Sequence, residues 1–109
     1  MCFGFVGSIN RRKGVVQLLR AFDRHFPGDR LVLCGRVHRE VAHEVRAAAQ
    51  VHTVGFGPVA PWYAQFDIMV FPTLLEGSAK VVYEAMAAGL AVITTPHAGS
   101  IIRDGVDGF

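Results

Sequence analysis

The chain has 109 residues, the size of a single domain. Hydrophobic residues make up 51% of the sequence and charged residues 18%, which allows a buried core and excludes a largely disordered chain. The net charge of +2 is too small to predict nucleic acid or an anionic membrane surface as a partner.

Neither the cysteines nor the apolar runs indicate export or a membrane span. Cys2 and Cys34 form no CxxC pair, and we expect both to be buried free thiols in a reducing compartment. No apolar run approaches the roughly 20 residues of a membrane-spanning helix, and the N-terminus lacks the pattern of a signal peptide. We therefore expect a soluble, cytoplasmic protein, and peripheral attachment of a longer parent to a membrane stays open.

Short apolar runs alternate with segments of helical periodicity along the chain. Strands are expected at 3–6, 31–34, 51–56, 67–71 and 90–94, and helices at 15–26, 39–50, 61–66 and 80–88. The first helix has the strongest signal, because five apolar residues recur on one of its faces: Val15, Leu18, Leu19, Phe22 and Phe26. A glycine-rich turn region, 96–108, follows the last strand.

The predicted strands determine the expected fold class. Each is a nearly continuous apolar run, which is typical of a parallel sheet with helices on both faces, so we predict a single α/β domain. Ligands of such sheets bind at the carboxyl ends of the strands, near the point where the strand order reverses. Five strand-terminal loops should share that edge: 7–14, the turn at Gly35, 55–58, 73–79 and 95–100.

A basic loop follows the first predicted strand. Arg11, Arg12 and Lys13 stand directly before the N-terminus of the first helix, where cations are unfavourable unless an anion is bound. The loop is therefore either a phosphate site or a solvated basic turn. It is not a Walker A loop, and no GxGxxG follows any strand, which disfavours a dinucleotide site.

Two glutamates eight positions apart are the second candidate feature. With Glu76 in a loop and Glu84 in the following helix, both carboxylates could accept hydrogen bonds from the vicinal hydroxyls of one sugar-containing ligand. The backbone amides of Gly77, Ser78, Ala79 and Lys80 would then face a phosphate. Alternatively, Glu84 is a surface residue paired with Lys80, or the two glutamates form a pair of the retaining-glycosidase type, which would leave the basic loop unused.

The histidines and the aromatic pair at 62–63 suggest no further site. His38 and His43 are five positions apart and do not share a helix face, so we expect no metal. Trp62 and Tyr63 are interpreted as core residues rather than as stacking platforms.

Two motifs together resemble a known family. The stretch FPTLLEGSAKVVYEAMAAG carries Phe71, Pro72, Glu76, Gly77, Glu84, Ala85, Met86, Ala87 and Gly89. The opening carries Gly7, Lys13, Gly14, Leu18, Leu19, Ala21 and Phe22. Both are similar to the donor-binding half of retaining GT-B glycosyltransferases, a group that includes mannosyl- and glucosyltransferases and sucrose and glycogen synthases.

The resemblance implies a Rossmann-like fold and a role for each candidate residue. Lys13 would contact the donor diphosphate, Glu76 the hydroxyls of the transferred sugar and Glu84 those of the ribose, with Lys13 and Glu76 as the catalytic residues. The implied donor-binding set is completed by Gly7, Ser8, Arg11, Arg12, Gly55, Phe56, Gly77, Ser78, Ala79 and Lys80, of which Gly55 and Phe56 would border the base. Family members transfer the sugar with retention and need no metal or other cofactor.

The sequence also departs from the family pattern. Ser8 stands where an arginine is common, so Arg11 or Arg12 is expected to supply the second positive charge. Ser78-Ala79 replaces the usual Phe-Gly, and Ala91 a usual proline.

The resemblance further implies a larger parent enzyme. The family's N-terminal domain, which binds the acceptor, has no counterpart in this chain, and its C-terminal helices are also missing. We therefore expect 1–109 to be an incomplete nucleotide-sugar-binding domain, inactive alone, that self-associates through an exposed sheet face. The alternatives are a non-catalytic nucleotide-binding module and half of a sugar-nucleotide epimerase or phosphorylase.

Overall fold

The computed structural model describes residues 1–74, 80–96, 104–106 and 108. Its five strands are β1 (Cys2–Val6), β2 (Arg30–Cys34), β3 (Val51–Thr53), β4 (Ile68–Phe71) and β5 (Ala91–Thr94). Its helices are α1 (Val15–His25), the 3₁₀ helix η1 (Arg39–Val41), α2 (Ala42–Ala47), α3 (Ala60–Tyr63) and α4 (Lys80–Ala87). The predicted alternation of strands and helices is confirmed.

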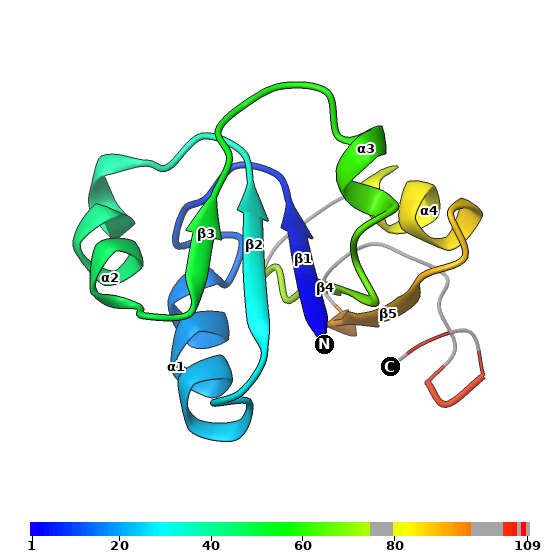
Figure 1. The fold of residues 1–109 in the computed structure, drawn as a ribbon, viewed down its shortest axis with the longest axis horizontal. Coiled ribbons are helices and arrows are strands. Elements are labelled where there is room, and N and C mark those ends of the chain that lie inside the picture. The colour runs from blue at the N-terminus through cyan, green and yellow to red at the C-terminus, as the bar shows by residue number, and fades with distance from the viewer. Residues whose placement is uncertain (75–79, 97–103, 107, 109) are drawn as a thin grey trace.

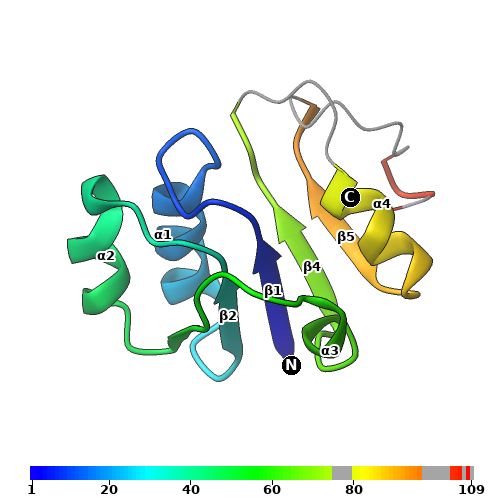
Figure 2. The same cartoon turned by 90° about the horizontal axis from the view of Figure 1, so that it is seen from above.

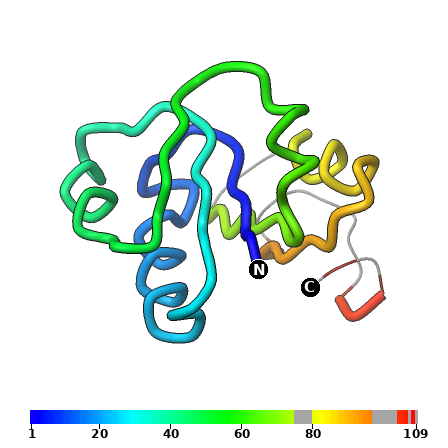
Figure 3. Tube along the Cα trace, viewed as in Figure 1, coloured from blue at the N-terminus to red at the C-terminus, as the bar shows by residue number. Residues whose placement is uncertain are grey.

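The strands form one parallel sheet in the order β3-β2-β1-β4-β5 (Figure 1). The chain starts in the centre with β1 and moves outward to β3, as the tube in Figure 3 shows. It then crosses back to β4 on the other side of β1, so the order reverses between β1 and β4. An α/β fold with a parallel sheet was the prediction, and it is confirmed.

Helices cover both faces of the sheet. Seen from above, α1 and α2 lie on one face and α3 and α4 on the other (Figure 2). Adjacent residues of β1 reach the two layers, because Phe3 packs edge-on against Phe22 of α1 with ring centroids 5.3 Å apart. A Cβ atom at the next position, Gly4, would lie only 2.1 Å from the ring of Phe66, the residue that follows α3 closely. The ring of Phe66 therefore packs directly on the backbone of the central strand.

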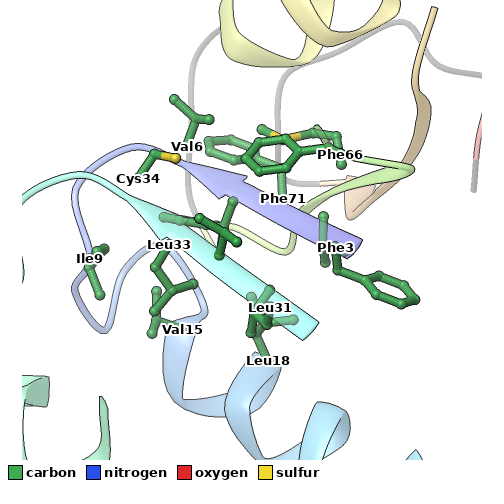
Figure 4. Close-up of a cluster of buried hydrophobic side chains, with 14 of the residues drawn as sticks. Phe3, Val6, Ile9, Val15, Leu18, Leu31, Leu33, Cys34, Phe66 and Phe71 are labelled. Atoms are coloured by element: carbon green, nitrogen blue, oxygen red, sulfur yellow. The ribbon is translucent and has the colours of Figure 1, made fainter. Parts of the chain in front are cut away.

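The core is built from the central strands and the helices on either side (Figure 4). All five residues of β1 and the last four of β2 are buried, as expected for strands with both faces covered. On the α1 side, Leu31 and Leu33 lie near Val15 and Leu18 in Figure 4. Leu31, Leu33 and Val15 are each 0% exposed, so these three side chains are fully shielded from water.

At the β3 edge of the sheet, two elements are shorter than predicted. The strand expected at 51–56 ends at Thr53, because only three residues pair in register with β2. Val54 adds one backbone hydrogen bond to Leu33, and Gly55 then turns the chain with φ +67°. The helix expected at 39–50 begins as a 3₁₀ turn and ends at Ala47, where Ala48 takes up an extended conformation. Both segments lie at the edge of the sheet, where fewer tertiary contacts extend a marginal element.

Two further expectations concern burial and membranes. Cys2 and Cys34 are buried and free, as predicted, and burial raises the pKa of the Cys34 thiol to about 11. Within the described ranges, every helix is too short or too polar to cross a bilayer.

Candidate functional site

The carboxyl ends of β1 and β4 lie next to each other, and the loops that follow them are joined. The carbonyl oxygen of Arg12 accepts hydrogen bonds from the backbone N–H of Leu74, at 2.8 Å, and from the hydroxyl of Thr73, at 3.3 Å. Thr73 is fully buried, and its own carbonyl accepts a hydrogen bond from the hydroxyl of Thr95 at 2.6 Å. The loops after β1, β4 and β5 therefore form one hydrogen-bonded unit at the sheet edge where ligands of such folds bind.

Gly14 allows the basic loop to approach β4 this closely. It adopts φ +73° immediately before α1, and a Cβ atom there would lie 2.0 Å from the carbonyl oxygen of Pro72. The turn before it is closed by Asn10, whose side-chain oxygen accepts a hydrogen bond from the backbone N–H of Lys13 at 3.0 Å. The conformation of the loop is thus fixed by its own residues and by contact with β4.

Backbone hydrogen bonds also join the loops after β1 and β2. Ile9 donates its N–H to the carbonyl of Arg36 at 2.9 Å, and His38 donates its N–H to the carbonyl of Ile9 at 3.0 Å. Ile9 itself is 0% exposed, so its side chain anchors the loop in the core.

An open pocket of about 990 Å³ lies at this edge, above the ends of β1, β2 and β3. Its lining includes the predicted donor-binding residues Gly7, Ser8, Gly55 and Phe56. The volume is at the upper end of the range of ligand-binding pockets, roughly 300–1,000 Å³. Phe56 is 94% exposed, so its ring is available to a ligand rather than packed in the core.

Neither arginine of the basic loop is among the residues that line this pocket. The backbone N–H of Arg11 donates to the Glu40 carboxylate at 3.0 Å and its guanidinium to the Glu40 carbonyl at 3.2 Å. The guanidinium also lies 3.9 Å from the carboxylate of Glu44. Arg11 therefore ties the loop to η1 and α2, while the side chain of Arg12 is exposed.

Arg36 is a pocket residue that the sequence analysis did not single out. It follows Gly35 at the end of β2, lines the pocket beside Ser8, and its side chain is exposed. Among the described residues no carboxylate pairs with it. The sequence feature that could have identified Arg36 is its position directly after Gly35, the glycine that follows β2 at the ligand-binding edge.

The side chain of Lys13, in the loop after β1, lies at the carboxyl end of the neighbouring strand β4. Its ammonium nitrogen is 5.4 Å from the centroid of the Phe71 ring, in a cation–π arrangement. Phe71 is the last residue of β4, so the charge of Lys13 stands at the point where the strand order reverses.

Glu84 of α4 is exposed and receives a hydrogen bond from Tyr63 of α3, with the phenol oxygen 3.0 Å from Oε2. Burial, and then the hydrogen bond to Glu84, raise the pKa of Tyr63 above its ordinary value, so the phenol stays protonated. Lys80 and Glu84, both described, form no ion pair, which removes the support for that alternative. Tyr63 is buried as predicted, but its polar partner was missed. A buried tyrosine usually requires such a partner.

The remaining predicted site residues cannot be placed. Glu76, Gly77, Ser78 and Ala79 lie outside the described residues, so their roles stay predictions. In the ranges that the structure covers, no three histidine, cysteine, aspartate or glutamate side chains lie close enough together to hold a metal ion.

Curated relatives of similar sequence are alpha-maltose-1-phosphate synthases. The chain is 34% identical over 120 residues to the alpha-maltose-1-phosphate synthase of Mycobacterium tuberculosis H37Rv, a match that covers 95% of this chain and 31% of the synthase. The synthase of Mycolicibacterium smegmatis is 32% identical over 121 residues, which cover 96% of this chain and 31% of that protein. The chain thus spans about a third of the length of these curated relatives.

Solved structures share the fold. The crystal structure of Anabaena Alr3699/HepE in complex with UDP and glucose matches with a TM-score of 0.85 and 22% identity, over 99% of this chain and 33% of that one. The C-terminal domain of the glycosyl transferase group 1 family protein LpcC from Francisella tularensis matches with a TM-score of 0.82 and 26% identity, over 99% of this chain and 65% of that one. These matches confirm the Rossmann-like half of a GT-B architecture. The family model described as Glycosyl transferases group 1 matches residues 2–109, and the chain therefore belongs to this family.

Proposed function

We propose that the chain is the donor-binding half of a glycosyltransferase that uses a nucleotide-diphosphate sugar. The observation that carries this proposal is the pocket of about 990 Å³ at the carboxyl ends of β1, β2 and β3. The pocket adjoins the point where the strand order reverses, and Lys13 stands at that point over the ring of Phe71. A pocket for an organic group beside a cation suits a nucleotide, which joins a base and a ribose to a diphosphate.

Family membership and the related proteins support the same function. The relatives of known sequence are alpha-maltose-1-phosphate synthases, and the structure of Anabaena HepE was solved with UDP and glucose. For this chain we infer a nucleotide-sugar donor without choosing the base or the sugar.

The site residues divide into three groups under this proposal. Gly7, Ser8, Gly55 and Phe56 line the pocket and would contact the base and ribose side of the donor. Lys13, with the amides of residues 77–80, would hold the diphosphate. Glu84 would accept hydrogen bonds from the ribose hydroxyls and Glu76 from those of the transferred sugar.

The proposed chemistry relies on charge stabilisation. As the bond from the sugar to the diphosphate breaks, negative charge grows on the leaving group, and fixed cations and backbone N–H groups lower the energy of that state. We propose transfer with retention of configuration and without a metal, to an acceptor bound by another part of a longer protein. A cytoplasmic location and self-association through the sheet remain part of this proposal.

Arg36 supplies the second positive charge in this proposal. Arg11 is already engaged by Glu40 and Glu44, whereas Arg36 lines the pocket beside Ser8, where the family commonly has arginine. Its long, exposed side chain can reach an anionic ligand in the pocket without breaking an existing ion pair among the described residues.

The test is a titration of the chain with UDP, GDP and ADP, in the wild type and in matched arginine variants. Arg36→Gln is expected to weaken nucleoside diphosphate binding roughly three- to tenfold, since one charged contact is lost at a solvated site. Arg11→Gln should weaken binding less, and Arg20→Gln, exposed on α1, should leave it unchanged. Equal effects of the Arg36 and Arg20 variants would contradict the role of Arg36, and no binding of any nucleotide would contradict the donor site.

A non-catalytic binding module is the competing function. It predicts the same binding, but no transfer of sugar from a labelled donor by the full-length protein that contains this chain. Detectable transfer would decide in favour of the enzyme.

A further inference from the structure

One hydrogen bond links the two helices on the same face of the sheet. Tyr63 ends α3 and Glu84 lies in the middle of α4, 21 positions later, and the phenol oxygen is 3.0 Å from Oε2 of the carboxylate. The two residues differ in exposure: Tyr63 is 8% exposed, whereas Glu84 is open to solvent. The buried Tyr63 hydroxyl therefore donates its hydrogen bond to an exposed carboxylate.

The packing around Tyr63 fixes the position of its hydroxyl. The ring meets the ring of Phe66 edge-on, with centroids 6.3 Å apart. Phe66 is 4% exposed and rests directly on the backbone of β1 at Gly4. Tyr63 therefore packs on Phe66, and Phe66 packs on the central strand β1. These core contacts, rather than α4, hold the phenol in place.

The chemistry of the pair leaves half of the carboxylate open. Burial and the contact with Glu84 raise the pKa of Tyr63, so the phenol donates a proton to the hydrogen bond and does not ionise at working pH. A carboxylate has about four acceptor positions, and the described residues occupy only one of them, at Oε2. No described residue donates a hydrogen bond to Oε1, and this oxygen is the one we assign to a ligand.

Such an arrangement removes a cost of binding. An exposed glutamate samples several rotamers and loses that freedom when a ligand hydroxyl binds. The hydrogen bond from Tyr63 already restricts the rotamers of Glu84, so part of this conformational entropy is lost on folding rather than on binding. The carboxylate is therefore oriented before the ligand binds.

We propose that Tyr63 is a positioning residue, which holds the Glu84 carboxylate so that its free oxygen accepts the vicinal hydroxyls of the donor ribose. This inference rests on the proposed function, which assigns the ribose to Glu84. It extends that function by giving a residue of the α3 core a role in recognising ribose. The competing explanation is that the hydrogen bond only fastens α3 to α4.

The test compares UDP with 2′,3′-dideoxy-UDP, which lacks both ribose hydroxyls, and repeats the comparison for GDP and ADP. Dissociation constants are measured by calorimetry or NMR titration for the wild type, Tyr63→Phe, Glu84→Gln and the double variant. Trp62→Phe is the control, because it alters the neighbouring aromatic side chain of α3 and retains the phenol. Thermal melting of each variant shows that it folds.

Tyr63→Phe is expected to weaken binding of the normal nucleotide roughly three- to tenfold and to leave binding of the dideoxy nucleotide unchanged. In the Glu84→Gln background the same substitution should have little further effect, because the carboxylate that it positions is gone. Trp62→Phe should preserve the preference for the ribonucleotide.

Three outcomes would overturn the inference, and they separate it from the proposed function. If Glu84→Gln abolishes the preference for ribose but Tyr63→Phe weakens both nucleotides equally or neither, Tyr63 only fastens the helices and the donor site stands. If Glu84→Gln leaves the preference intact, the ribose role of Glu84 fails and the role of Tyr63 fails with it. If no nucleotide binds the wild type, the donor site itself is wrong.

Discussion

Gly14→Ala is expected to lower the free energy of unfolding by roughly 3 kcal/mol, a large share of the stability of a domain of this size. Gly14 adopts φ +73°, which costs a residue with a side chain about 1–2 kcal/mol. The added methyl would also lie 2.0 Å from the carbonyl oxygen of Pro72, so the backbone of one loop must move. Urea unfolding followed by circular dichroism measures the change.

Gly28→Ala is the matched control for this prediction. A Cβ atom at Gly28 meets nothing within 4 Å, and the substitution should change the free energy of unfolding by less than about 0.5 kcal/mol. If Gly14→Ala proved as mild as Gly28→Ala, the close contact between the basic loop and β4 would be wrong. The hydrogen bonds from Thr73 and Leu74 to Arg12 would then lose their structural basis.

Lys13→Met is expected to weaken binding of a nucleoside diphosphate roughly 10- to 100-fold, the loss of one charge-assisted hydrogen bond at 1.5–3 kcal/mol. Binding of the uncharged nucleoside should stay the same, because the lysine is proposed to contact only the diphosphate. Methionine keeps the unbranched apolar stem of the side chain and removes the ammonium group, so the variant tests the charge. A calorimetric titration with UDP and with uridine measures both effects.

Two controls test whether Lys13 acts through its charge: the variant Lys13→Arg, and the dependence of UDP affinity on ionic strength. Arginine retains the positive charge and should recover most of the affinity for UDP. Wild-type affinity should fall as ionic strength rises, and less steeply in Lys13→Met. Loss of the cation over Phe71 should itself cost no more than about 1 kcal/mol of stability. Equal losses for UDP and uridine would place Lys13 outside the diphosphate site.

Sequence patterns predicted the order of the elements because each strand is an apolar run that must be buried. Strand β1 shows this well, since Cys2–Val6 is buried throughout and the prediction missed only its first residue. The patterns predicted edges poorly. Periodicity cannot show that β3 pairs in register with β2 for only three residues, because the pairing depends on a second strand.

The sequence predicts which site residues follow strands and so lie at the ligand-binding edge. It does not predict which side chains form hydrogen bonds or ion pairs with each other. Gly7, Ser8, Gly55 and Phe56 follow strands, and parallel strands bring them to one pocket. The contacts of Arg11 with Glu40 and Glu44 depend on how η1 and α2 pack against the loop, 29 or more positions away in sequence. Arg36 lies in no motif that the sequence pattern offers, and the fold alone places it in the pocket lining. The hydrogen bond from Tyr63 to Glu84 likewise depends on how α3 packs against α4.

The most direct test of the donor site is an NMR titration of the ¹⁵N-labelled chain with UDP, GDP and ADP. Amide shifts caused by the bound nucleotide are expected to gather at the carboxyl edge of the sheet. They should be largest in the loops after β1, β2 and β3, at Gly7, Ser8, Arg36, Gly55 and Phe56. Shifts at the opposite edge, or no shift with any of the three nucleotides at millimolar concentration, would contradict the donor site.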